Sequence, residues 1–108
     1  MHVTRLAEAP SYDPRCLRLQ GHEATPTEAL WLGLSHLLPG GHTAFDASPL
    51  EKLYVVVEGG VTVVADGGEA TLGALNSCRI APGEQRRLEN RTNRPAAILL
   101  AMPHPPAG

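Results

Sequence analysis

Three glycine doublets divide the middle of this chain into short apolar runs. They lie at positions 40–41, 59–60 and 67–68, each between segments rich in Val, Leu or Ile. Short apolar runs separated by glycine-containing turns are typical of consecutive β-strands. The runs 61–65 and 70–72 are joined through Asp-Gly-Gly-Glu, and Asp-Gly is a favoured hairpin dipeptide, so we expect a hairpin there. The sequence therefore predicts an all-β fold.

The rest of the chain offers little helix. The one candidate segment, residues 26–32, runs directly into Gly33 and a β-like stretch, so we expect a strand over residues 30–38. The N-terminal segment through Pro14 and the proline-rich tail from Pro103 have little periodicity. We expect both to lie on the surface or to form edge arms.

Length and charge restrict the organisation and the partners of the chain. Its 108 residues can bury one hydrophobic core but not two, so we expect a single domain over residues 1–108 with its core at about 30–103. A formal charge of −2 with scattered basic residues argues against a nucleic-acid or anionic-membrane partner. No apolar run approaches the roughly 20 residues of a membrane span.

The two cysteines suggest a reducing compartment. Cys16 and Cys78 lie far apart and form no Cys-x-x-Cys motif, and the first residues lack the apolar stretch of a secretory leader. We therefore expect two reduced thiols in a cytoplasmic protein.

Residues 86–91 alternate in character, as expected for a strand with two different faces. One face carries only charged side chains, namely Arg87, Glu89 and Arg91. The other face is predicted to point into the protein and consists of Arg86, Leu88 and Asn90.

The strand predicted at residues 51–58 has two apolar faces. Lys52 shares one face with Tyr54 and Val56, and Leu53, Val55 and Val57 form the other. An antiparallel sheet with one face in solvent would have polar residues on that face. The second face therefore requires a cover, from the terminal arms or from a second copy of the chain, and we expect a homodimer.

Two segments resemble the two sequence motifs of the small cupins. Residues 39–59 resemble the first motif and residues 80–90 resemble the second. Gly41, Gly59, Gly83 and Asn90 match scaffold positions of the motifs, and Pro82 lies one place after the proline of the second motif. The resemblance spans roughly residues 30–103 and implies a cupin-type double-stranded β-helix, that is, a jelly-roll barrel. It does not imply a reaction, because this fold carries many activities.

All four metal-ligand positions of that family are substituted. The resemblance places them on Asp46, Ser48, Lys52 and Arg86. A protonated Lys or Arg cannot ligate a divalent cation and would repel one, so we expect no metal and no other cofactor. A shifted metal site built from His36 and His42 is the alternative, and we favour surface or turn histidines at both positions.

The substituted positions predict an anion site instead. Two cations and one carboxylate leave an excess of positive charge, which is costly to bury without compensation. We interpret the site as a pocket for a small organic anion, with Arg86 as a fork-shaped donor and Lys52 as a point charge. The alternative is an internal salt-bridge network of Asp46, Lys52 and Arg86 that fills a degenerate site.

The resemblance also implies the remaining wall of the pocket. Besides Tyr54, which shares the Lys52 face, the wall consists of Trp31, Gly33, Ser35, Thr43, Ile98, Leu100 and Met102. Simple alternation also puts Ile98, Leu100 and Met102 on one face of the last strand. Such a lining is typical of small-molecule sites and equally of any small barrel core.

Two function classes remain open on this basis. One is a metal-free module that binds a small organic anion. The other is a cofactor-independent isomerase or lyase in which Lys52 is a catalytic base of lowered pKa. A metal-dependent cupin enzyme with a non-standard site ranks third.

Overall fold

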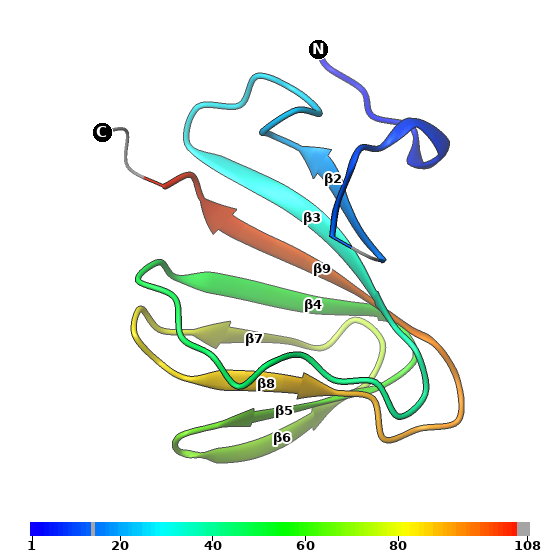
Figure 1. The fold of residues 1–108 in the computed structure, drawn as a ribbon, viewed down its shortest axis with the longest axis vertical. Helices are drawn as coiled ribbons and strands as arrows, with labels where there is room; N and C mark the ends of the chain where they lie inside the picture. Colours follow the sequence, from blue (N-terminus) through cyan, green and yellow to red (C-terminus); the bar gives the residue numbers. More distant parts are fainter. Residues whose placement is uncertain (14, 106–108) are drawn as a thin grey trace.

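The computed structural model describes residues 1–13 and 15–105, and nearly all of its regular structure is antiparallel sheet (Figure 1). The elements in chain order are the 3-10 turn η1 (Leu6–Glu8) and the strands β1 (Ser11–Asp13), β2 (Cys16–Gln20), β3 (Leu30–Leu37), β4 (Lys52–Glu58), β5 (Val61–Ala65), β6 (Gly68–Leu72), β7 (Ser77–Ile80), β8 (Arg86–Glu89) and β9 (Ala96–Pro103). A six-stranded sheet has the order β1-β2-β3-β9-β4-β7, and a three-stranded sheet has the order β6-β5-β8. The all-β prediction is confirmed. Within the described ranges, no helix has the length and apolar character needed to span a membrane.

Local sequence signals account for several of these elements. The predicted hairpin is the β5–β6 pair, in which Ala65 lies opposite Gly68 around the Asp-Gly turn. The strand predicted at residues 30–38 is β3. Both predictions are confirmed, because each depends on turn residues and alternation that are local in the sequence.

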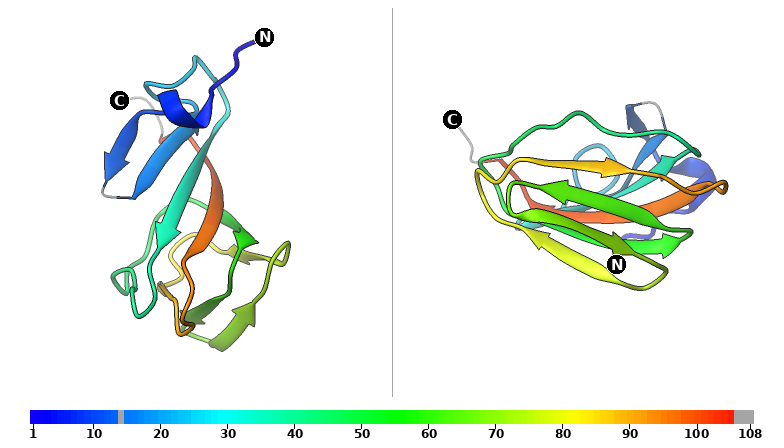
Figure 2. Two further views of the ribbon diagram at one scale, coloured as in Figure 1. Left: turned by 90° about the vertical axis from the view of Figure 1, so that its right-hand side faces the viewer. Right: turned by 90° about the horizontal axis from the view of Figure 1, so that it is seen from below.

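The hydrophobic core lies between the two sheets. The larger sheet contributes Val56 and Ile98, and the smaller sheet contributes Val61, Val63 and Leu88, all of them buried. Figure 2 shows the two sheets from two further directions. A core between two inner faces is the usual arrangement of packed antiparallel sheets.

The crossing from the larger to the smaller sheet depends on Gly59. This residue joins β4 to β5 with a φ of +79°, and a Cβ at this position would lie 2.7 Å from the carbonyl oxygen of Pro95. Only glycine avoids both the left-handed strain and the collision. This explains why the position matches the glycine of the cupin motif.

The segment between β3 and β4 runs antiparallel beside β8. The backbone nitrogens of Gly40, Thr43 and Asp46 donate hydrogen bonds to the carbonyl oxygens of Asn90, Leu88 and Arg86, at 2.8, 2.9 and 3.1 Å. In Figure 1 this segment is the green trace that crosses beside β8. The segment therefore extends the smaller sheet and holds β8 in place.

The N-terminal segment forms the outer edge of the larger sheet. β1 pairs with β2, and β2 pairs with β3 with Cys16 opposite Ser35 and Arg18 opposite Gly33. The sequence predicts a surface segment or an edge arm here, and the structure adds that the arm forms strands. Pro14 and residues 106–108, which belong to the predicted arm and tail, lie outside the described residues.

Cys16 and Cys78 are free thiols, each partly buried. This agrees with the expected reduced state. The compartment itself stays a prediction.

Candidate functional site

A cavity of about 580 Å³ opens on the inner face of the larger sheet. Its wall combines the N-terminal strands, β3, β4 and β9 with β8 and the segment beside it. The structure brings most of the predicted site residues to this one cavity: Thr43, Lys52, Tyr54, Arg86, Ile98, Leu100 and Met102. Asp46 and Ser48 do not line it.

Strand register explains why one wall of the cavity is continuous. Leu100 of β9 lies opposite Gly33 of β3 on one side and opposite Tyr54 of β4 on the other. Ile98 is paired in the same way two residues along β9. Directly opposed residues on paired strands point to the same face, so these side chains form rows across the sheet.

Arg86 is held from two directions. Its Nε donates a hydrogen bond to the hydroxyl oxygen of Tyr54 at 2.9 Å, and one terminal nitrogen donates to the backbone carbonyl oxygen of Asp46 at 3.2 Å. The backbones of Asp46 and Arg86 also form an antiparallel bridge. The guanidinium is therefore fixed in orientation without a carboxylate partner among the described residues.

Tyr54 is buried, and burial raises the pKa of its phenol, although Arg86 opposes this effect. The phenol is consequently neutral at ordinary pH. Its oxygen accepts from Arg86, and its own proton has no acceptor among residues 1–13 and 15–105. A buried hydroxyl with a proton to donate is suited to contact a polar ligand.

Lys52 lines the same cavity and is partly buried. It makes no side-chain hydrogen bond or ion pair with any residue in the described part of the chain. Burial lowers the pKa of its amine, repulsion from Arg86 lowers it further, and Asp46 partly opposes the shift. An amine in this situation gains more than an ordinary lysine by meeting an anion or by losing its proton.

The side chains of Asp46 and Ser48 form hydrogen bonds within their own loop and do not line the cavity. The exposed Asp46 carboxylate accepts a hydrogen bond from the backbone nitrogen of Ala47 at 2.8 Å. Ser48 Oγ accepts one from the backbone nitrogen of Leu50 at 3.1 Å. The salt-bridge network considered for Asp46, Lys52 and Arg86 is therefore not formed, because short-range turn contacts hold the carboxylate.

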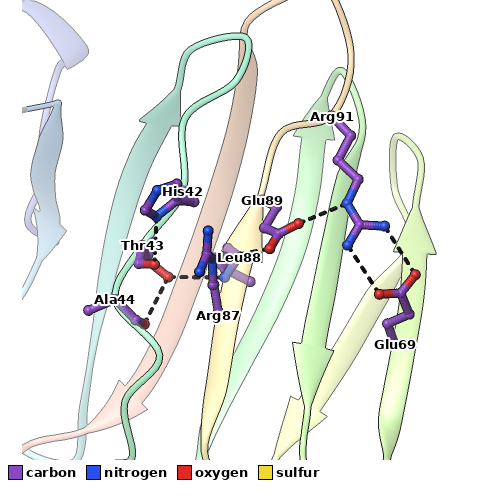
Figure 3. A network of polar contacts seen from close by, with 8 residues as sticks. All are labelled: His42, Thr43, Ala44, Glu69, Arg87, Leu88, Glu89 and Arg91. Carbon is purple, nitrogen blue, oxygen red and sulfur yellow. Dashed lines mark hydrogen bonds and ion pairs between the residues drawn. The ribbon is translucent and has the colours of Figure 1, made fainter.

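Thr43 fixes the loop beside β8 (Figure 3). Its hydroxyl oxygen accepts a hydrogen bond from the backbone nitrogen of Leu88 at 3.0 Å and donates to the carbonyl oxygen of Ala44 at 3.4 Å. The predicted charged face of β8 lies alongside. There Glu89 forms ion pairs with Arg87 at 3.1 Å and Arg91 at 2.8 Å. Arg87 Nε lies at ion-pair distance but makes no aligned hydrogen bond.

His36 and His42 also line the cavity, and both are exposed. His42 Nδ1 lies 3.2 Å from the carbonyl oxygen of its neighbour Thr43. No group of three or more His, Cys, Asp or Glu side chains that could hold a metal occurs among the described residues. With Lys52 and Arg86 at two of the positions where a cupin would hold its metal, the donor set does not fit a divalent cation.

The N-terminal strands supply site residues that sequence reasoning missed. Tyr12, Asp13, Arg15, Cys16 and Arg18 line the cavity. Arg18 lies 3.7 Å above the ring of Tyr12 and 4.5 Å from the ring of Trp31, and its Nε lies 3.2 Å from a carboxylate oxygen of Glu23. Alternation in residues 16–20 could have identified β2. Its position over the cavity depends on pairing with β3, which has no local signal.

Positive charge dominates the cavity lining. The cations are Arg15, Arg18, Lys52 and Arg86. The one carboxylate among the described lining residues is Asp13. Even with Arg18 paired to Glu23, which lies outside the lining, the cavity has an electrostatic preference for an anion.

These features define a small two-sheet jelly roll of the cupin type, with Lys52 and Arg86 in the wall of its cavity. No family model matches the sequence. A cupin 2 conserved barrel domain protein from Salinispora arenicola has the same fold, with a TM-score of 0.78, 16% identity, and coverage of 94% of this chain and 87% of that one. A sugar phosphate isomerase from a cupin superfamily of Silicibacter pomeroyi matches with a TM-score of 0.73 and 22% identity. That match covers 86% of this chain, which spans 62% of the isomerase. The jelly-roll prediction is confirmed.

A relative with much closer sequence defines the family. The chain is 42% identical over 113 residues to the Mycobacterium tuberculosis protein Beta-D-galactosidase Rv1717, a match that covers 99% of this chain and 97% of that protein. The chain belongs to the family of this mycobacterial protein.

Proposed function

We propose that this cupin binds a small organic anion in its cavity without a metal, with Arg86 and Lys52 as the anion contacts. One observation supports the proposal above all. The oriented guanidinium of Arg86 and the amine of Lys52, which has no partner among the described residues, line the same cavity. Arg86 is oriented by Tyr54, and Lys52, two residues from Tyr54 on β4, lines the same cavity. A ligand carboxylate or phosphate would compensate both charges.

The size and lining of the cavity support a small ligand. A volume of about 580 Å³ lies within the range typical of small-molecule sites. The aliphatic row of Ile98, Leu100 and Met102 would contact the carbon skeleton, while the cations fix the charged end. Asp46 contributes indirectly, since its backbone carbonyl accepts from Arg86. Ser48 and Thr43, the other expected ligand contacts, have hydroxyls already engaged with the loop.

An Arg86→Ala variant tests this proposal. We expect binding of small carboxylates or phosphates, measured by titration calorimetry, to weaken by about 1.5–3 kcal/mol, the usual worth of a charged hydrogen bond. Arg94→Ala is the matched control, because the exposed side chain of Arg94 does not line the cavity. Equal anion affinities for wild type and Arg86→Ala would contradict the proposal.

Glycoside hydrolysis is a second candidate. It is supported by the similarity to the mycobacterial protein Beta-D-galactosidase Rv1717 and by the carboxylate of Asp13 in the cavity wall. Glycosidases generally use two carboxylates that flank the scissile bond. Asp13 is one carboxylate at this cavity, and the Asp46 carboxylate turns to Ala47 instead. Release of nitrophenol from a chromogenic β-D-galactoside by wild type, and its loss in Asp13→Asn, would support this candidate. Equal rates of nitrophenol release by wild type and Asp13→Asn would show that Asp13 takes no part in hydrolysis.

A further inference from the structure

Lys52 is the only lysine in the chain, and its surroundings are those of a reactive amine. It stands at the first position of β4, partly buried, in the wall of the cavity. Burial and the neighbouring Arg86 lower its pKa, so a larger share of the amine is neutral than in an ordinary lysine. A neutral, desolvated amine is a nucleophile toward carbonyl carbons.

We propose that Lys52 forms an imine with the carbonyl carbon of a small 2-oxo acid whose carboxylate is bound by Arg86. The inference rests on the proposed function, because Arg86 must first hold the anion. It adds a substrate class and a covalent step to that function. It also gives Lys52 the role of nucleophile in place of the base that the sequence suggested.

The geometry brings an anion contact and an amine to the same part of the cavity. Lys52 and Tyr54 are two residues apart on β4 and therefore share a face. The Tyr54 hydroxyl holds Arg86 Nε at 2.9 Å, which keeps the guanidinium beside that face. In a 2-oxo acid the carbonyl carbon is bonded directly to the carboxylate. An acid bound by Arg86 would thus hold its carbonyl carbon within the cavity that Lys52 also lines.

Tyr54 supplies the proton that the first step requires. The nitrogen lone pair of neutral Lys52 forms a bond to the carbonyl carbon, and the π electrons of the C=O bond move to oxygen. That oxygen takes a proton from the Tyr54 hydroxyl, and the nitrogen releases a proton that restores the phenol directly or through water. The carbinolamine then loses its hydroxyl group and the remaining N–H proton as water, which leaves a C=N bond. The sum is amine plus carbonyl giving imine plus water, with no oxidant or reductant.

Reductive trapping tests the inference on the intact protein. Wild-type protein is incubated with pyruvate or 2-oxoglutarate and cyanoborohydride, and the adducts are located by peptide mass mapping. The N-terminal amine of the fully exposed Met1 is the one other amine and serves as an internal reference. We expect the adduct on Lys52 to form faster than the adduct on Met1. Lys52→Arg, which keeps the positive charge, should lose the Lys52 adduct and retain the one on Met1.

The Arg86 contact is tested in the same assay. Arg86→Gln should slow the Lys52 adduct by about tenfold or more, the factor that corresponds to loss of a charged hydrogen bond, while labelling of Met1 is unchanged. Acetone, a ketone without a carboxylate, should label wild-type Lys52 more slowly than pyruvate. Lactate, a carboxylate with a hydroxyl in place of the ketone group, should compete with pyruvate for Arg86 and so slow the labelling of Lys52.

The outcomes separate this inference from the proposed function. If lactate binds to wild type more tightly than to Arg86→Gln while Lys52 is trapped no faster than Met1, anion binding stands and imine formation is overturned. If lactate does not bind and acetone labels Lys52 as fast as pyruvate, the anion site fails, and the 2-oxo acid assignment fails with it.

Discussion

The hydroxyl of Tyr54 accepts a 2.9 Å hydrogen bond from Nε of Arg86, and this contact links the two sheets inside the cavity. Tyr54 belongs to β4 of the larger sheet and Arg86 to β8 of the smaller one. Together with the backbone carbonyl of Asp46, this contact orients the guanidinium that we propose as the anion contact. A fixed donor loses less conformational entropy on binding than a free one.

A Tyr54→Phe variant should separate the orientation of Arg86 from its charge. We expect anion affinity, measured by calorimetry, to fall by about 0.5–1.5 kcal/mol, less than in Arg86→Ala, because the cation stays but loses one of the two hydrogen bonds that orient it. Phe retains the buried ring, so circular dichroism should show an intact fold. An affinity equal to wild type would mean that the tyrosine does not position Arg86.

Replacing Lys52 with Met should leave the fold at least as stable as wild type near neutral pH. The pKa of Lys52 is lower in the folded protein than its ordinary value of 10.5, so protonation favours the unfolded chain. This cost is fully present below the folded-state pKa and disappears as pH rises toward 10.5. Urea denaturation should therefore show the gap between Lys52→Met and wild type closing with rising pH. A gap that does not change with pH would contradict the assigned shift.

The same variant distinguishes binding from catalysis. If Lys52 contacts an anion, wild type should gain thermal stability from carboxylates or phosphates and Lys52→Met should gain less. If the protein is an isomerase or lyase with Lys52 as its base, turnover should vanish in Lys52→Met. No anion-dependent shift in wild type, together with a higher melting temperature for the variant, would contradict ligand binding.

Asn90 should be essential to stability. The side chain is buried, donates to the carbonyl oxygens of Leu37 at 2.8 Å and Arg94 at 2.7 Å, and accepts from the backbone nitrogen of Thr92 at 2.9 Å. Asn90→Ala leaves these groups without their partner, so we expect a loss of about 2 kcal/mol or more in urea denaturation. Asn93→Ala, at an exposed position in the same turn, is the control and should change little.

Exposed apolar residues on the outer face of the larger sheet support a homodimer. Leu30 and Leu53 are exposed there, 56% and 47%, and both line a depression of about 220 Å³ whose lining is mainly apolar. We propose that a second copy covers this face. Sedimentation should give a dimer for wild type and a monomer for Leu53→Asp, while Leu6→Asp, outside both sheets, stays dimeric. A monomeric wild type at micromolar concentration would contradict the proposal.

The metal content of the purified protein is predicted from the donor set. With Lys52 and Arg86 at two ligand positions of the cupin motifs, we expect well under one equivalent of Mn, Fe, Ni, Cu or Zn by elemental analysis. Close to one tightly held metal per chain after dialysis would contradict this prediction and would favour the shifted metal site built from His36 and His42.

The strands and inward faces could be predicted from the sequence because their signals are local. Asp66-Gly67 specifies a tight turn, and the period of two in a strand determines which side chains share a face. For this reason alternation predicts inner faces for Lys52, Tyr54 and Arg86 and for the aliphatic row of β9, and all of these residues line the cavity. Gly59 matched its motif because a tight backbone approach requires glycine.

Contacts between distant segments were decided only by the tertiary structure. The motif alignment places Asp46 in the site, but its carboxylate accepts a hydrogen bond from the backbone nitrogen of the adjacent Ala47 and does not line the cavity. The bond between Tyr54 and Arg86 and the placement of Arg18 over Trp31 each depend on which strands pair and in which register. Alternation specifies a face but not the partner strand. Partner choice comes from the packing of two whole sheets around one core, and that packing formed the cavity.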